Sequence, residues 1–98
     1  MKVLFIETGR EPVIREINNT LKDMQSLVGG YIEVVTDKPN VAIVVNEEGK
    51  LLDTCIPNRF FRNDIIFGDF FVCGVDGEDF CSIPDEEIDY YMAIFERR

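Results

Sequence analysis

The stretch YIEVVTDKPNVAIVVNEE, residues 31–48, contains the strongest strand patterns of this chain. Its two halves, 31–37 and 40–48, are rich in valine and isoleucine, whose β-branched side chains favour strands. Only Lys38 and Pro39 separate them, whereas two parallel strands need a crossover of about a dozen residues or more. We therefore predict an antiparallel pair of strands here, and we place the other elements around it.

The chain before this pair begins with a predicted β-hairpin. Residues 2–7 and 13–17 have strand patterns on either side of a turn. In the second of these strands we expect Val13, Ile14 or Ile17 to face inward, because apolar and charged residues alternate there.

Residues 18–30 predict a short helix between the hairpin and the strand pair. One of the polar residues 18–20 can accept a hydrogen bond from the free N–H groups at its start. Gly29 or Gly30 suits the left-handed conformation that ends many helices.

The chain after the strand pair predicts further short strands with turns between them. A charged turn is expected at 47–50 and another at 76–79. Short strands are expected at 51–57, 64–67, 69–75 and 80–83.

A final helix is predicted after Ile83. Ser82 with Asp85 resembles a capping box at its start. One face of this helix carries an apolar stripe, which consists of Ile88, Tyr91, Met92 and Phe95. The predicted class is α+β, with an antiparallel or mixed β-sheet and two short helices packed on it, in a single compact domain spanning residues 1–98.

The composition limits the possible functions. The chain carries 19 acidic and 10 basic residues, a formal net charge of −9, and its acids are concentrated in residues 76–98. Such a surface repels duplex DNA, whose binding depends on many contacts between cations and phosphates. No apolar run is long enough to cross a membrane, and the N-terminus has the pattern of a strand and not of a signal peptide.

Histidine is absent, and the three cysteines, Cys55, Cys73 and Cys81, form no paired motif. We therefore expect no zinc site, no cofactor and no catalysis by the usual Ser-His-Asp or Cys-His arrangements. Free cysteines are typical of a reducing cytoplasm, so we expect a cytoplasmic protein. Because histidine is absent, we also expect that the protein is not an enzyme. An enzyme would still be possible through carboxylates, for example a hydrolase that uses the adjacent Glu47 and Glu48.

The stretch IPNRFFRND, residues 56–64, places two arginines around two phenylalanines. Arginine offers a planar fork of donors to phosphate, and aromatic rings stack on bases, which indicates a small nucleotide site. Alternatively, this stretch is a loop whose phenylalanines fill the core while its arginines are solvated. The double glycine before Tyr31 could let a ligand approach the backbone, or it could simply end the helix. The candidate ligand-binding residues are Gly29, Gly30, Tyr31, Glu33, Asn58, Arg59, Phe60 and Arg62.

The acidic C-terminal helix is a second candidate surface. It could bind a basic partner, including as a mimic of nucleic acid, or it could be a solvated helix that keeps the protein soluble. The candidate partner-binding residues are Asp85, Glu86, Glu87 and Asp89.

Three blocks of the sequence are considered together: LVGGYIEVV (27–35), NEEGKLLDTCIPNRFFRND (46–64) and IIFGDFFVCGVDGEDFCSIPDEEIDYY (65–91). They resemble a family of small domains of unknown function encoded by phages, mobile elements and mostly Gram-positive bacteria. The matching positions are Gly29–Glu33, Asn46–Lys50, Pro57–Arg59, Gly68 and Gly74. The resemblance brings no catalytic residues. It implies a genomic context of accessory genes, whose small products often counter host defence.

Our leading hypothesis is a non-enzymatic binding protein of phage or mobile-element origin that counteracts host defence by sequestering a small nucleotide. The alternative is an acidic inhibitor that binds a basic host protein through its C-terminal helix. Neither hypothesis involves a membrane. Either protein could be a homo-oligomer, because short strands leave sheet edges that can pair.

Overall fold

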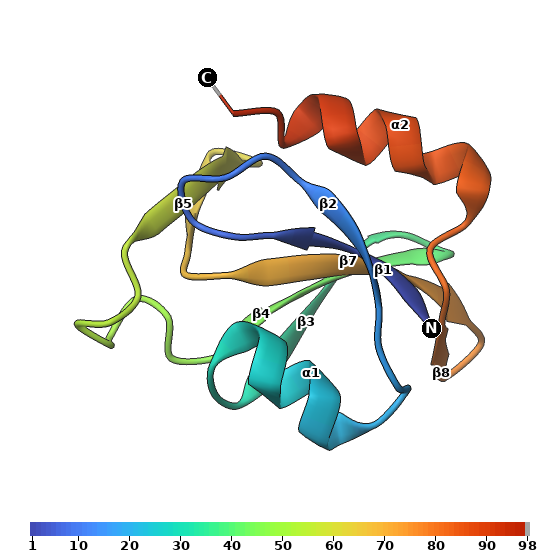
Figure 1. Cartoon of the computed structure of the whole chain (residues 1–98), viewed down its shortest axis with the longest axis horizontal. Coiled ribbons are helices and arrows are strands. Elements are labelled where there is room, and N and C mark those ends of the chain that lie inside the picture. The colour runs from blue at the N-terminus through green and yellow to red at the C-terminus, as the bar shows by residue number, and fades with distance from the viewer. Residues whose placement is uncertain (98) are drawn as a thin grey trace.

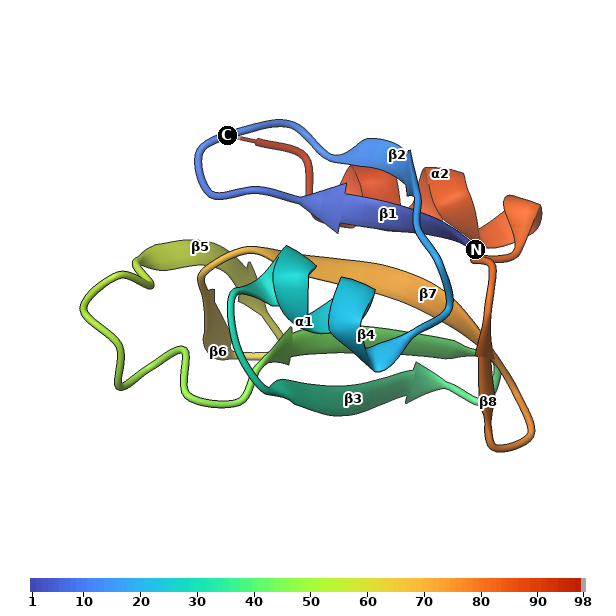
Figure 2. The same ribbon diagram turned by 60° about the horizontal axis from the view of Figure 1, so that its bottom comes forward.

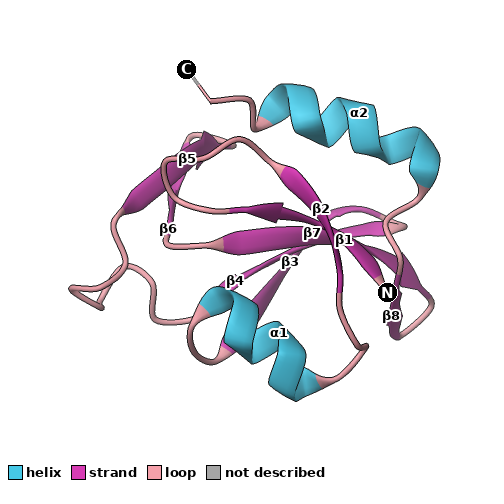
Figure 3. Ribbon diagram, in the orientation of Figure 1, coloured by secondary structure: helices cyan, strands magenta, loops and turns pink. Residues whose placement is uncertain are grey.

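The computed structural model describes residues 1–97 and contains an antiparallel sheet, a separate β-hairpin and two helices (Figures 1 and 3). All strand pairings among these residues are antiparallel, so the predicted α+β class is confirmed. In chain order the elements are β1 (Lys2–Ile6), β2 (Val13–Glu16), α1 (Leu21–Val28), β3 (Ile32–Lys38), β4 (Val41–Asn46), β5 (Pro57–Phe61), β6 (Asp64–Phe67), β7 (Phe70–Asp76), β8 (Asp79–Cys81) and α2 (Asp85–Ile94).

The main sheet has the strand order β2-β1-β7-β4-β3, and β8 pairs with β7. The predicted antiparallel pair, β3 and β4, forms one side of this sheet, with Val34 opposite Val44. The predicted hairpin of β1 and β2 forms the other side. Strand β7 lies between β1 and β4 and joins the two pairs into one sheet.

The core occupies both faces of the sheet. Since neighbours along a strand point to opposite faces, Leu4 packs in one cluster with Tyr91 and Phe95 of α2, while Val3 packs in another with Met24 of α1. Strands β1, β4 and β7 are therefore covered on both sides, which explains their unbroken apolar sequences. The predicted stripe on α2 is confirmed, because Tyr91 and Phe95 are fully buried.

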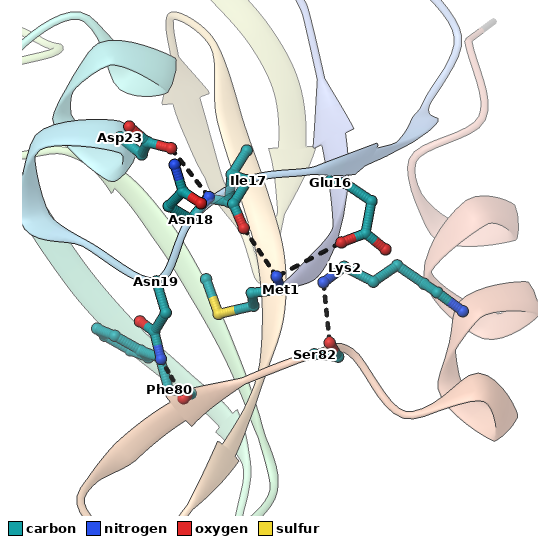
Figure 4. Close-up of polar contacts among 9 residues, drawn as sticks. All are labelled: Met1, Lys2, Glu16, Ile17, Asn18, Asn19, Asp23, Phe80 and Ser82. Atoms are coloured by element: carbon teal, nitrogen blue, oxygen red, sulfur yellow. Dashed lines mark hydrogen bonds and ion pairs between the residues drawn. The ribbon is translucent and has the colours of Figure 1, made fainter.

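The N-terminus is tied to the fold at the corner shown in Figure 4. The amino group of Met1 donates to the carbonyl of Ile17 at 2.7 Å, and the backbone N–H of Lys2 donates to the Ser82 hydroxyl at 2.9 Å. Ser82 is thus engaged by β1. The predicted capping box is wrong, since Pro84 is the N-cap of α2 and makes no side-chain cap bond.

The first helix has the caps that its sequence predicts. The Thr20 hydroxyl accepts from the N–H of Asp23 at 3.2 Å, and Gly29 takes a left-handed conformation with φ of 79°. Within residues 1–97, neither α1 nor α2 has the length and apolar character that crossing a bilayer requires.

One local prediction is wrong, and another holds for only one of its three candidate residues. Residues 51–56 form turns and irregular chain instead of a strand, with the N–H groups of Leu51 and Leu52 both bonded to Glu48, and Leu51 is 81% exposed. Of the three residues of which one was expected to face inward, Ile17 packs against the core cluster on the α1 side, whereas Val13 and Ile14 do not face inward. They are 42% and 40% exposed because β2 is an edge strand that neither helix covers fully.

Candidate functional site

The IPNRFFRND stretch forms a β-hairpin, not the expected loop. Strands β5 and β6 pair with Phe60 opposite Ile65, and the turn residues Arg62 and Asn63 both have positive φ, 50° and 61°. This hairpin is a separate two-stranded sheet beside the main one (Figure 2). Left-handed conformations at two successive residues match the tight turns that twist with a hairpin.

The two phenylalanines have different environments. Phe61 packs against the α2 side of the core, and its ring centroid lies 5.4 Å from that of Phe95. Phe60 points away from the core and is 67% exposed. The core-filling interpretation therefore holds for Phe61 alone, and Phe60 is available to a ligand.

Arg59 is held by protein carbonyls. Its Nε donates to the carbonyl of Phe95 at 2.8 Å, and its Nη1 donates to the carbonyl and to the side-chain oxygen of Asn58 at 3.1 and 2.8 Å. Its Nη2 donates to the carbonyl of Arg10. Since a guanidinium has five N–H groups, these bonds leave one free, and Arg59 cannot offer a two-pronged fork to phosphate.

The charge of Arg59 acts on its surroundings even so. Partial burial lowers the pKa of Arg59, the carboxylate of Glu11 opposes this effect, and the nearby guanidinium of Arg97 lowers the pKa further. Both guanidinium groups lie on the lining of one cavity, so an anion bound there would reduce the repulsion between them.

Asn58 has a mainly structural role. Its side-chain N–H groups donate to the carbonyl of Ile6 at 3.0 Å and to that of Gly68 at 2.8 Å. Together with Arg59, it fastens the hairpin to the end of β1 and to the end of α2.

A cavity of about 500 Å³ lies next to these residues, and we call it the arginine cavity. Its charged lining consists of Arg59, Arg97 and Glu96. No carboxylate among residues 1–97 lies within 4.0 Å of the Arg97 guanidinium. The complete lining is Thr8, Gly9, Pro57, Asn58, Arg59, Phe60, Ile94, Glu96 and Arg97.

Arg62 faces a different environment from Arg59. It forms an ion pair with the carboxylate of Asp37, and its Nη2 donates to the carbonyl of the same residue at 3.1 Å. Asp37 also accepts from the hydroxyl of Tyr91. Burial and then this bond raise the pKa of Tyr91. Arg62 thus connects the hairpin turn to β3, and through Asp37 to α2.

A second cavity, of about 390 Å³, lies between the hairpin and the β3–β4 part of the sheet, and we call it the hairpin cavity. Lys50 and Asp64 on its lining form an ion pair of 2.8 Å. This contact holds the pKa of Asp64 below its usual value. The complete lining is Glu33, Val35, Ile43, Val45, Asn46, Glu47, Gly49, Lys50, Leu51, Phe61, Arg62, Asp64, Ile65, Ile66 and Phe67.

The structure therefore divides the eight predicted ligand-binding residues. Asn58, Arg59 and Phe60 line the arginine cavity, whereas Glu33 and Arg62 line the hairpin cavity. The remaining three, Gly29, Gly30 and Tyr31, line neither cavity.

Gly30, the second residue of the double glycine, lies against the side chain of Asn46, the last residue of β4. A β-carbon on Gly30 would lie 2.9 Å from the side-chain nitrogen of Asn46. Asn46 is buried, donates to the carbonyl of Val28 at 3.0 Å and accepts from the N–H of Glu48 at 2.8 Å. Sequence reasoning missed the structural role of Asn46. The signal was a lone asparagine at the end of an apolar strand.

The acidic face of α2 is partly neutralised. Asp85 pairs with Lys2 at 3.0 Å, and Glu87 pairs with Lys38 at 2.6 Å. The bond to Glu87 raises the pKa of Lys38. Of the four candidate partner-binding residues, the other two, Glu86 and Asp89, are exposed and form no ion pair among residues 1–97.

The remaining reactive side chains do not converge. Glu47 and Glu48 are exposed in the turn after β4, and residues 1–97 contain no group of three or more cysteines and carboxylates placed to hold a metal ion. The cysteines are unpaired, and burial raises the pKa of Cys73 to about 12.

A comparison with known families shows the family of this chain. The profile described as "Domain of unknown function (DUF3846)" matches residues 1–96. The chain belongs to this family. No curated protein and no solved structure matches the chain. Membership in DUF3846 confirms the resemblance to a domain of unknown function. The match covers β1 to α2, the whole lining of the hairpin cavity, and the lining of the arginine cavity except Arg97.

Proposed function

We propose that this DUF3846 protein is a non-enzymatic binding protein that sequesters a small nucleotide in the arginine cavity. One observation carries the proposal. In a chain of net charge −9, Arg59 and Arg97 converge on one cavity beside the exposed ring of Phe60. Phosphate groups bind such cations, and nucleotide bases stack on such a ring.

The roles of the lining residues follow from their contacts. Arg97 is the principal phosphate ligand, because its guanidinium has no carboxylate partner among residues 1–97. Arg59 supplies fixed positive charge and one free N–H. Phe60 stacks on the base. The opposing charges of Glu96 and Glu11 favour a ligand with few phosphates over a long strand.

The proposal includes the biological setting that the family resemblance implies. The protein originates from a phage or mobile element, acts in the host cytoplasm, and counteracts defence by removing a nucleotide signal. A binding protein that forms a stoichiometric complex needs no catalytic group for this task.

Isothermal titration of the purified protein with a panel of cyclic and linear nucleotides tests the proposal. We expect saturable heat with one binding site per chain for at least one member. The double variant Phe60→Ala/Arg97→Ala should abolish this heat. Arg62→Ala is the matched control, since it removes another exposed arginine that lies outside the arginine cavity. Absence of heat with every nucleotide would contradict the proposal.

The acidic face of α2 supports a second function more weakly. Two of its four carboxylates are paired with lysines of the same chain, so it displays less free charge than the sequence indicates. Charge reversal of Glu86 and Asp89 should therefore leave nucleotide binding intact. If charge reversal of Glu86 and Asp89 abolished capture of a basic host protein, the inhibitor hypothesis would replace the nucleotide hypothesis.

A further inference from the structure

We infer that the hairpin cavity is a second binding site, specific for a neutral, apolar small molecule. It is separate from the arginine cavity, and no residue lines both. Its volume of about 390 Å³ lies in the range of about 300–1,000 Å³ that is typical of small-molecule sites.

The chemistry of the lining selects an apolar ligand. The β3–β4 strands contribute Val35, Ile43 and Val45, and the hairpin contributes Phe61 and Ile66 from the opposite side. These side chains are only partly buried, apart from Ile43, so a ligand between them would remove further apolar surface from water. Each Å² of such surface contributes about 25 cal/mol.

The charges of the lining disfavour an anion. The lining contains two cations, Lys50 and Arg62, and each is already paired with a carboxylate, Asp64 or Asp37. Three acidic residues, Glu33, Glu47 and Asp64, also line it, so the lining has one more negative charge than positive charges. Asn46, the amide on the lining, has both its side-chain nitrogen and its side-chain oxygen hydrogen-bonded within the protein. A neutral ligand meets no unpaired cation and no unsatisfied buried amide.

The hairpin over this cavity gives the ligand a way in. Strands β5 and β6 pair with each other and with no strand of the main sheet among residues 1–97. The two ion pairs, Arg62 with Asp37 and Lys50 with Asp64, join this part of the hairpin to the rest of the chain. The Lys50–Asp64 pair is exposed on both sides and contributes little stability, so a ligand can enter past it while the contacts of Asn58, Arg59 and Phe61 keep the hairpin in place.

Fluorescence titration with N-phenyl-1-naphthylamine, a neutral probe that emits strongly in apolar surroundings, tests this inference. The wild-type protein should bind the probe saturably at one site. Val45→Phe fills the cavity and should weaken binding at least tenfold. Val34→Phe is the matched control, because Val34 is the same residue type on the neighbouring strand but lies outside the cavity, so it should bind like the wild type.

Two outcomes would overturn the inference: no saturable binding by the wild type, or equal binding by the two variants. If Val45→Phe does not fold, nuclear Overhauser contacts between the bound probe and the methyl groups of Val45 and Ile66 in the wild type decide instead, and their absence counts against the site. Arg97→Ala should leave probe binding unchanged. The nucleotide proposal and this one can therefore fail independently.

Discussion

The two cavities share one hairpin, and the stretch that lines both of them contains one arginine for each. In the arginine cavity, the guanidinium of Arg59 is bonded to protein carbonyls, while that of Arg97 forms no ion pair among residues 1–97, although the backbone N–H of Arg97 donates to the Glu11 carboxylate at 2.5 Å. In the hairpin cavity, Arg62 is exposed but paired with Asp37. The partners of an arginine, more than its presence or exposure, therefore determine whether it can bind a ligand.

The largest expected difference between Arg59 and Arg62 is in their contributions to the free energy of unfolding. Arg59→Ala should lower the free energy of unfolding by about 3 kcal/mol, because it leaves the carbonyls of Phe95 and Arg10 without their donor. Arg62→Ala should cost less, about 1–2 kcal/mol, because Arg62 itself is exposed and the buried carboxylate of Asp37 keeps its bond from Tyr91. Urea denaturation of both variants measures the difference.

Arg59→Lys serves as the control for charge in this comparison. A single ammonium keeps the charge but cannot bond the separate carbonyls that the guanidinium reaches, so most of the loss should remain. If Arg59→Ala and Arg62→Ala were equally stable, the structural role assigned to Arg59 would be wrong.

The two phenylalanines should differ in the same direction. Phe61→Ala should destabilise the protein by about 2 kcal/mol, because its ring packs against Phe95 in the core. Phe60→Ala should change stability by less than about 0.5 kcal/mol, since its exposed ring has little packing to lose. Thermal unfolding followed by circular dichroism distinguishes them, and a reversed order would show that the hairpin faces the core the other way round.

Nucleotide affinity should depend on the cavity and not on the count of arginines. Arg97→Ala should weaken binding about tenfold, equivalent to about 1.4 kcal/mol, by removing the principal phosphate contact. Arg62→Ala should leave the dissociation constant within about twofold of the wild type. Titration calorimetry with the best nucleotide of the panel measures both, and a larger loss in Arg62→Ala would move the site to the hairpin cavity.

The smallest expected effect is a titration shift in the hairpin cavity. Lys50 holds the pKa of Asp64 below its ordinary value, so Lys50→Ala should raise that pKa towards the ordinary one. Carboxyl carbon shifts followed by NMR against pH report it directly. If the Asp64 midpoint were already ordinary in the wild type, Lys50 would be free to bind an anion, and the contrast between the cavities would weaken.

The sequence predicted those parts of the fold that depend on local patterns. The β-branched run at 31–48, the α2 stripe and the Thr20 and Gly29 caps were correct because periodicity and capping act over a few neighbouring residues. The strand at 64–67 was predicted correctly, but its pairing with 57–61 in a hairpin was missed, since Arg62 and Asn63 are not the usual glycine-containing pair for such a turn.

The site was harder to predict than the fold. Arg97 joins Arg59 only through the docking of α2 on the sheet, which brings together residues far apart in sequence. Likewise, no local pattern shows that Arg59 is bonded to Phe95 or that Arg62 is paired with Asp37. Long-range packing decides these partners, and with them the chemistry that each arginine has left to offer.

Chemical-shift mapping on the isotopically labelled protein shows which of the two cavities binds the nucleotides. On addition of the nucleotides, we expect perturbed backbone amides at Gly9, Phe60 and Arg97, with little change at Lys50 and Arg62. Perturbation confined to Lys50 and Arg62, or no perturbation by any nucleotide, would contradict the claim that the arginine cavity is the nucleotide site.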